Sequence, residues 1–310
     1  MSPMKFTILF VLFLSVCLPI RSFGEKLNVP HFTTAPESLL PPKIHESAER
    51  TRYPVILAHG LLASAHAFSM KRLRRYLRKQ GFQVFLTEVD GANTIEYRSR
   101  QLSKQVDKIL TWTGAEKVNL VGHSMGGLDS RFLISELGYE NRVASLTTFS
   151  TPHRGSAAAD MVLQDLREGG SLIPSLLKWF LSWYNPHSSV FQSDIEVAIE
   201  NLTPGYMESF NERVEDAPEV FYQSYGANAA ESSDALHPIF DEAYQTILQQ
   251  EGPNDGLVSL DSSRWGAFRG VLPTDHARVV GVRLHPLEPN RFDFRGHMKK
   301  VLIDLAGRGF

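Results

Sequence analysis

A short strand-forming run followed directly by a serine between two glycines constrains the fold of this chain more than any other feature. Residues 118–121 are typical of a strand, Gly122-His123-Ser124-Met125-Gly126 forms a tight turn, and residues 128–137 are predicted to be helical. In such a turn the middle residue adopts a strained backbone conformation, and flanking glycines let the neighbouring backbone pass. The sequence therefore predicts that Ser124 is presented as a nucleophile above a sheet. A chance match of common residues is the alternative.

Strand-like and helix-like segments alternate from residue 53 onward, which predicts an α/β fold. The continuous apolar run at 54–58 is typical of a strand that is buried on both faces, and further strands are expected at 83–89, 118–121, 142–150 and 218–226. Helical patterns occupy 71–80, 96–111, 128–137 and 295–305, and a short strand or extended segment is expected at 278–282. This alternation implies right-handed crossovers and a mostly parallel central sheet with helices on both sides.

The domain organisation follows from shifts in composition along the chain. Residues 1–24 join Lys5 to an apolar run and a small-residue end, which predicts a secretory signal peptide and export to the periplasm or the medium. Residues 25–51 hold several prolines and are expected to be an extended lead-in, and 52–310 form one domain. Residues 157–211 interrupt the alternation as a helical insertion. Its apolar centre, 172–184, is either a buried core helix or part of a lid.

Charge and cysteine content exclude some functions. The chain has 32 basic and 34 acidic residues, a net charge of −2 that gives no indication of a nucleic-acid partner. Cys17 is the single cysteine and lies in the predicted signal peptide, so the processed chain cannot form a disulfide or use a thiol in catalysis.

Serine needs an adjacent base and an acid that orients this base, and on an α/β-hydrolase scaffold both follow the serine in the order acid, then histidine. Asp255, in an Asn-Asp-Gly turn, is the favoured acid, and the alternatives are Asp234, Asp241 and Asp261. His276 is the favoured base because it lies in a loop 21 residues after Asp255. His285 stays an alternative, whereas His297 lies in the predicted last helix.

A second requirement is a pair of donors for the negative charge that develops on the substrate. The His59-Gly60-Leu61-Leu62 segment follows the first predicted strand, where an oxyanion hole is built. We therefore expect the backbone N–H groups of Leu61 and Met125 to form this hole. By itself the segment could equally be an ordinary loop.

Four ordered motifs together resemble the secreted bacterial triacylglycerol lipases of the Pseudomonas and Burkholderia type. They lie at 53–62, 117–127, 150–156 and 254–258, and the resemblance extends from residue 53 to the C-terminus. It implies the α/β-hydrolase fold, a mobile helical lid and a triad of Ser124, Asp255 and His276. It also implies hydrolysis of long-chain acyl esters at a lipid–water interface, by a chain that we expect to be a monomer.

The chain departs from this family in two respects. The family commonly has a disulfide, and it binds calcium through two aspartates, one at a position like Asp234 and one two residues after the catalytic histidine. Here that second position is Arg278, a cation that is unsuited to a calcium site. We therefore expect no cofactor and no metal, and hypothesise that Arg278 pairs with Asp234 and steadies the His276 loop. An exposed Arg278 without a partner is the alternative, and dependence on a folding chaperone, known in this family, is not decided by the sequence.

The resulting hypothesis is an exported serine ester hydrolase, specifically a triacylglycerol lipase. The alternatives are a short-chain carboxylesterase and a phospholipase or acyltransferase. More remote is a non-catalytic scaffold that binds a lipid or a protein.

Overall fold

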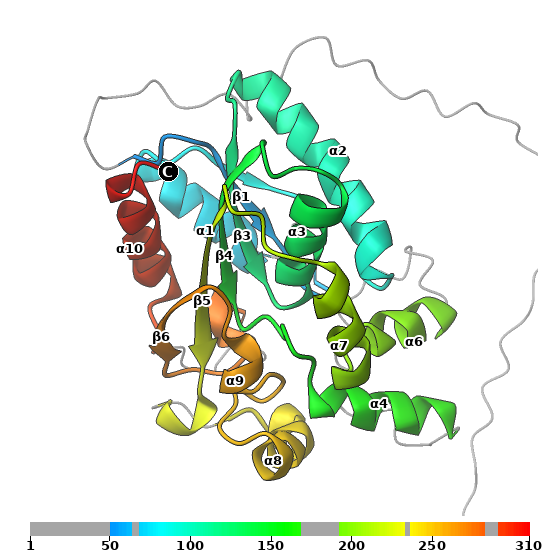
Figure 1. The fold of residues 1–310 in the computed structure, drawn as a ribbon. Coiled ribbons are helices and arrows are strands. Elements are labelled where there is room, and N and C mark those ends of the chain that lie inside the picture. The colour runs from blue at the N-terminus through cyan, green and yellow to red at the C-terminus, as the bar shows by residue number, and fades with distance from the viewer. Residues whose placement is uncertain (1–49, 64–67, 169–191, 233–235, 283–290) are drawn as a thin grey trace, which may run out of the picture. The chain divides into compact units, whose positions relative to one another are not determined.

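The computed structural model describes residues 50–63, 68–168, 192–232, 236–282 and 291–310, and Pro41–Phe310 forms one compact unit. The predicted mostly parallel sheet with flanking helices is confirmed (Figure 1). Its elements are β1 (Val55–Ala58), α1 (Phe68–Lys79), β2 (Val84–Leu86), α2 (Ile95–Thr113), β3 (Val118–His123), α3 (Met125–Glu136), β4 (Val143–Phe149), α4 (Ala157–Arg167), α6 (Gln192–Glu200), α7 (Pro204–Arg213), β5 (Phe221–Ala227), α8 (Asp241–Gln250), α9 (Leu260–Ser263), β6 (Ala267–Leu272) and α10 (Phe294–Gly307), with short 3-10 helices at Ala229–Glu231, Pro238–Phe240 and Arg278–Val280.

The sheet has six strands in the order β2-β1-β3-β4-β5-β6, and each adjacent pair is parallel. The strand that precedes Ser124, β3, therefore lies between β1 and β4. Parallel strands end at a common edge, so the loops after β1, β3 and β4 meet there. This edge brings residues 59–62 next to the turn at Ser124.

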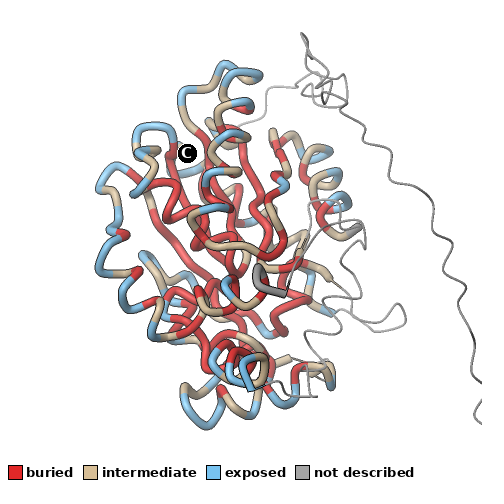
Figure 2. The backbone as a smooth tube through the Cα atoms, turned by 90° about the vertical axis from the view of Figure 1, so that its right-hand side faces the viewer, coloured by how far each residue is buried: buried red, intermediate tan, exposed pale blue. Residues whose placement is uncertain are grey.

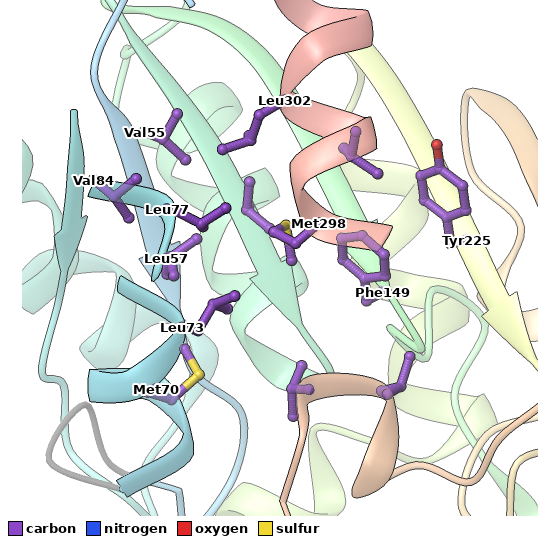
Figure 3. Packing of buried hydrophobic residues seen from close by; sticks show 14 of the residues in the cluster. Val55, Leu57, Met70, Leu73, Leu77, Val84, Phe149, Tyr225, Met298 and Leu302 are labelled. Carbon is purple, nitrogen blue, oxygen red and sulfur yellow. The ribbon is translucent and has the colours of Figure 1, made fainter. Parts of the chain in front are cut away.

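Alternate residues of the strands bury two apolar layers, one on each face of the sheet. Val55 and Leu57 of β1 pack with α1 and α10, as Figure 3 shows, whereas Ile56 packs on the opposite face with α2 and α3. Figure 2 shows the same arrangement as buried backbone in the centre and exposed backbone on the outer turns. Both faces are covered, which explains why the strands are apolar at successive positions.

Some predicted elements differ from the observed ones. Residues 278–282 are not extended, because Arg278–Val280 forms a 3-10 turn in which the Asp275 carboxylate accepts the backbone N–H groups of Ala277 and Arg278. The sixth strand, β6, was not predicted, because it is a half-exposed edge strand without a continuous apolar run. The strand expected at 83–89 is shorter than predicted, Val84–Leu86.

The helical insertion expected at 157–211 is seen as α4, α6 and most of α7. Its apolar centre at 172–184, and the predicted signal peptide and most of the lead-in, lie outside the described residues. Within the described part of the chain, no helix has the length and apolar character needed to cross a membrane.

Candidate active site

The turn at Ser124 has the strained geometry that its sequence predicts. Ser124 has φ 53° and ψ −133°, in the left-handed half of backbone space that a side chain rarely occupies. A Cβ on Gly122 would lie 2.6 Å from the Cα of Gly127, and one on Gly126 would lie 2.6 Å from the carbonyl oxygen of Ala58. Both positions therefore require glycine, and the turn directs Ser124 away from the strand.

Asp255 and His276, predicted as acid and base, are brought into contact. His276 Nδ1 lies 3.0 Å from Asp255 Oδ2, and both residues are buried, with 5% of His276 and 0% of Asp255 exposed. The other carboxylate oxygen accepts the backbone N–H groups of Leu257 and Val258, at 3.0 and 2.8 Å. Asp255 is thus fixed by its own turn, and a fixed carboxylate at Nδ1 leaves Nε2 of His276 free to accept a proton.

The charge state of Asp255 follows from the same contacts. Burial alone would raise the pKa of its carboxyl group, but the charge and the hydrogen bond of His276, together with the other hydrogen bonds to the carboxylate, outweigh burial and hold this pKa below its usual value. Asp255 is therefore ionised at neutral pH, and it stabilises a positive charge that forms on His276 during a reaction.

Ser124 and His276 line one apolar cavity, together with Leu61, Val162, Ile199 and Leu257. No hydrogen bond joins these two described side chains, and in the absence of substrate such bonds are often longer than in the reacting complex. A cavity with a nucleophile and a base in an otherwise apolar wall suits a reacting group that is joined to apolar substrate atoms.

The residues of both predicted oxyanion donors lie close to the nucleophile. Leu61 lines the cavity, and Met125 is the first residue of α3, so its N–H has no partner inside the helix. A Cβ on Gly60 would lie 2.8 Å from Ser124 Cβ, which shows how closely this loop approaches the nucleophile. The loop is held by His59, whose Nε2 accepts the backbone N–H of Val89 at 3.2 Å.

A buried ion pair that the sequence analysis did not identify joins the oxyanion loop to the nucleophile helix. Arg98 of α2 donates to Asp129 of α3 at 2.8–3.2 Å, and both side chains are almost fully buried. Arg98 also donates to the carbonyl oxygens of His59, at 2.9 Å, and of Asp90. Burial raises the pKa of Asp129 to about 6, with Arg98 acting in the opposite direction, so the pair is charged at neutral pH. The only sequence signal was an arginine and an aspartate in two predicted helices, where charges are usually exposed.

A second unpredicted contact supports the base. His123 Nε2 lies 3.0 Å from the backbone carbonyl oxygen of His276, and the two rings lie 4.8 Å apart. Because a carbonyl can only accept, Nε2 of His123 carries the hydrogen. His123 therefore holds the backbone of the base from the residue next to the nucleophile.

The pH dependence of stability should reveal the protonation state of His123. Burial, followed by the charge of His276, lowers the pKa of His123 to about 3, whereas an unfolded histidine titrates near 6.5. The unfolded chain therefore binds more protons below pH 6.5, and this histidine lowers the free energy of unfolding by up to about 1.4 kcal/mol per pH unit as the pH falls from 6.5 towards 3.

We expect His123→Gln, whose side-chain amide can still donate to His276, to lose this part of the acid destabilisation. Urea unfolding at pH 7, 6, 5 and 4 measures it. The carboxyl group of Asp129 raises the free energy of unfolding as the pH falls from about 6 to about 4. Because Asp129 is present in both proteins, this contribution cancels in the comparison. Equal slopes in the two proteins would contradict the assignment.

The alternative acids and bases are placed away from the cavity or outside the described residues. Asp241 and Asp261 are exposed in the first turns of α8 and α9. His297 packs edge-on against Tyr225 at 5.0 Å between ring centres. Asp234 and His285 lie outside the described residues.

Arg278 is buried, so the alternative of an exposed, unpaired side chain is wrong. Its Nη1 lies 2.5 Å from Asp275 Oδ2, next to the predicted base. The predicted pairing with Asp234 stays a prediction, because Asp234 is outside the described residues. A buried guanidinium does not fit a calcium site, and the described residues contain no cluster of three or more His, Cys, Asp or Glu that could hold a metal.

Comparisons with known proteins agree with this geometry. Residues 53–226 match the family model described as alpha/beta hydrolase fold. The chain is 33% identical to Triacylglycerol lipase 2 of Saccharomyces cerevisiae over 77% of its own length and 73% of the relative. It is 30% identical to the triacylglycerol lipase of Pseudomonas fragi over 78% and 95% of the two chains. The crystal structure of a Bacillus licheniformis lipase in its mature form superposes with a TM-score of 0.63 at 20% identity, covering 84% of this chain and 96% of that one, a likeness that shows the fold alone.

Proposed function

Because the chain belongs to the α/β-hydrolase superfamily and, within it, to the triacylglycerol lipases, we propose that it is an exported lipase that hydrolyses long-chain acyl esters of glycerol at a lipid–water interface. The chain is a serine ester hydrolase. The observation that supports the finer proposal is the apolar cavity, whose wall brings Ser124 and His276 to one acyl-sized space. Export is proposed from the apolar run after Lys5.

In the proposed mechanism, His276 Nε2 takes the Ser124 proton while Ser124 Oγ forms a bond to the ester carbonyl carbon. The N–H groups of Leu61 and Met125 hold the oxyanion, and each such donor contributes roughly 3 kcal/mol to transition-state stabilisation. The tetrahedral intermediate then breaks its bond to the alcohol oxygen, which receives the proton from His276. Water, deprotonated by His276, cleaves the acyl-enzyme in the same way and releases the fatty acid.

No metal ion enters this mechanism. In its place we propose that Arg278, paired with Asp275 and predicted to reach Asp234, steadies the loop that carries His276. The pair adjoins the base directly, so its loss would displace Nε2 from Ser124.

A series of glycerol esters from tributyrin to triolein, with and without EDTA, tests both proposals. We expect turnover to rise when the substrate exceeds its solubility and to include the long-chain esters, with activity and melting temperature unchanged by EDTA. A control without enzyme and a phosphatidylcholine substrate complete the series.

Full activity on dissolved short esters with none on emulsions would favour a carboxylesterase, and preference for phosphatidylcholine would favour a phospholipase. Inactivation by EDTA that only calcium reverses would contradict the role of Arg278.

A further inference from the structure

Helix α1 concentrates positive charge on its outer surface. It has six basic residues and no acidic one in its twelve positions, although the whole chain has a net charge of −2. Leu73 and Leu77 of this helix are buried against the sheet, as Figure 3 shows. The cations therefore cover the side of the helix that faces away from the core, and they are Lys71, Arg72, Arg74, Arg75, Arg78 and Lys79.

Four of these cations have no acidic partner within the part of the chain that the structure describes: Lys71, Arg74, Arg75 and Lys79. We call these four residues the basic surface. Lys71, Arg75 and Lys79 are exposed. Burial and the neighbouring charge of Arg74 lower the pKa of Arg78, which shows that like charges are crowded here. A counter-charge from outside the described residues would relieve this repulsion.

The neighbouring helix α10 extends the positive charge. α1 and α10 pack on the same face of the sheet and share one apolar cluster. The guanidinium of Arg295 from α10 lies 5.6 Å from the ring centre of Tyr76 in α1. The acidic residue Asp304 of α10 is already paired with Arg269 and Arg308, so it does not neutralise the basic surface.

The same helix takes part in the substrate cavity. Met70, in the first turn of α1, lines the cavity that contains Ser124. With a rise of about 1.5 Å per residue, Lys71, Arg74 and Arg75 lie within roughly 8 Å of Met70 along the helix axis. An object bound by these cations is therefore held beside the apolar cavity.

We propose that the basic surface docks the protein onto an anionic lipid surface and thereby brings the cavity to its substrate. The inference rests on the proposed function in that it takes a lipid aggregate as the substrate. An anionic lipid interface presents phosphate or carboxylate groups above an apolar interior, which matches cations placed beside an apolar cavity. A nucleic acid or an acidic protein would match the cations but not their position at this cavity.

Binding to vesicles tests the docking independently of catalysis. Ser124→Ala serves as the background, so that no lipid is hydrolysed, and the vesicles are phosphatidylcholine alone or phosphatidylcholine with phosphatidylglycerol at 3:1. We expect binding to the anionic vesicles only, and its loss at high salt because exposed charges are screened. Lys71→Gln with Arg75→Gln should weaken binding about 25-fold, at about fivefold for each charge.

The matched control is Lys104→Gln with Lys108→Gln, two exposed lysines at the same spacing on α2, which packs on the opposite face of the sheet. It should leave vesicle binding unchanged. Equal binding to neutral and anionic vesicles, an equal loss in the α2 control, or tighter binding to dextran sulfate than to the vesicles would overturn the proposal.

A second measurement separates this proposal from the proposed function. With Ser124 present, the α1 double variant should hydrolyse a dissolved p-nitrophenyl ester at the parent rate but lose activity on an anionic emulsion. Lys79→Gln, at the end of α1 remote from Met70, should lose less of the activity on the anionic emulsion than the α1 double variant does. An unaltered emulsion rate in the α1 variant would contradict the docking role, whereas absence of ester hydrolysis in the parent would contradict the proposed function and leave the vesicle result to stand alone.

Discussion

Replacing Ser124 by alanine is expected to lower kcat for ester hydrolysis by about 10⁴- to 10⁶-fold, because no other described hydroxyl that lines the cavity with His276 lies in a strained turn. The change removes one oxygen and leaves the flanking glycines in place. We therefore expect the melting temperature to stay within a few degrees of the parent. Turnover of a p-nitrophenyl ester and thermal unfolding followed by circular dichroism measure the two quantities.

The matched control is Ser135→Ala, in the same helix but away from the cavity. It should keep the parental rate, and a fluorophosphonate should still label its Ser124. The Ser124→Ala variant should lose both the rate and the labelling. Hydrolysis by Ser124→Ala at close to the parental rate would exclude Ser124 as the nucleophile. Loss of fold in this variant would be seen as a lost unfolding transition and would be tested with Ser124→Gly, since glycine accepts the positive φ at this position.

The nucleophile turn could be predicted because its requirements are local. The strand, the two glycines and the helix are contiguous in the sequence, and only the close approach of Gly126 to Ala58 involves a distant segment. The pairing of Asp255 with His276 was predicted from chain order and loop position, and their side chains do meet. The order serine, acid, histidine along the chain was thus enough to predict a contact between two residues that are 21 positions apart.

Contacts between distant elements were not predictable in the same way. Arg98 and Asp129 are 31 residues apart on two helices, and their spacing within each helix gave no reason to expect burial. At Arg278–Val280 the apolar pattern suggested an extended segment. The chain turns there instead, because the Asp275 carboxylate accepts hydrogen bonds from the backbone N–H groups of Ala277 and Arg278. In both cases a side-chain interaction overrode the pattern from which the element was predicted.

Replacing Arg98 by methionine is expected to reduce the free energy of unfolding by about 3–5 kcal/mol at neutral pH, because it leaves the Asp129 carboxylate buried without its cation. The variant also loses the donor that holds the carbonyl oxygen of His59. Displacement of the oxyanion loop should lower kcat for a dissolved ester by about 10- to 100-fold, with a smaller change in KM. Urea unfolding and initial rates at a temperature where the variant is folded measure both effects.

The pH dependence identifies the cause of this loss. Without Arg98, the pKa of Asp129 in the folded protein should rise from about 6, while the unfolded value stays near 4. The folded variant then binds a proton that the unfolded chain does not, so its stability should increase as the pH falls from 7 to 5, relative to the parent. Asp129→Asn leaves the guanidinium charged at every accessible pH, and it should be destabilised without this recovery.

The double variant Arg98→Met with Asp129→Leu removes both charges. It should be more stable than the summed losses of Arg98→Met and Asp129→Leu, each measured alone, predict, since no unpaired charge remains buried. Its kcat should stay low, because methionine cannot donate to His59. Arg142→Met, which breaks an exposed ion pair with Asp107, is the control for loss of an arginine and should change stability little. Additive losses in the Arg98 and Asp129 cycle would show that the two residues do not act as a pair, and a parental kcat in the double variant would show that Arg98 does not position the oxyanion loop.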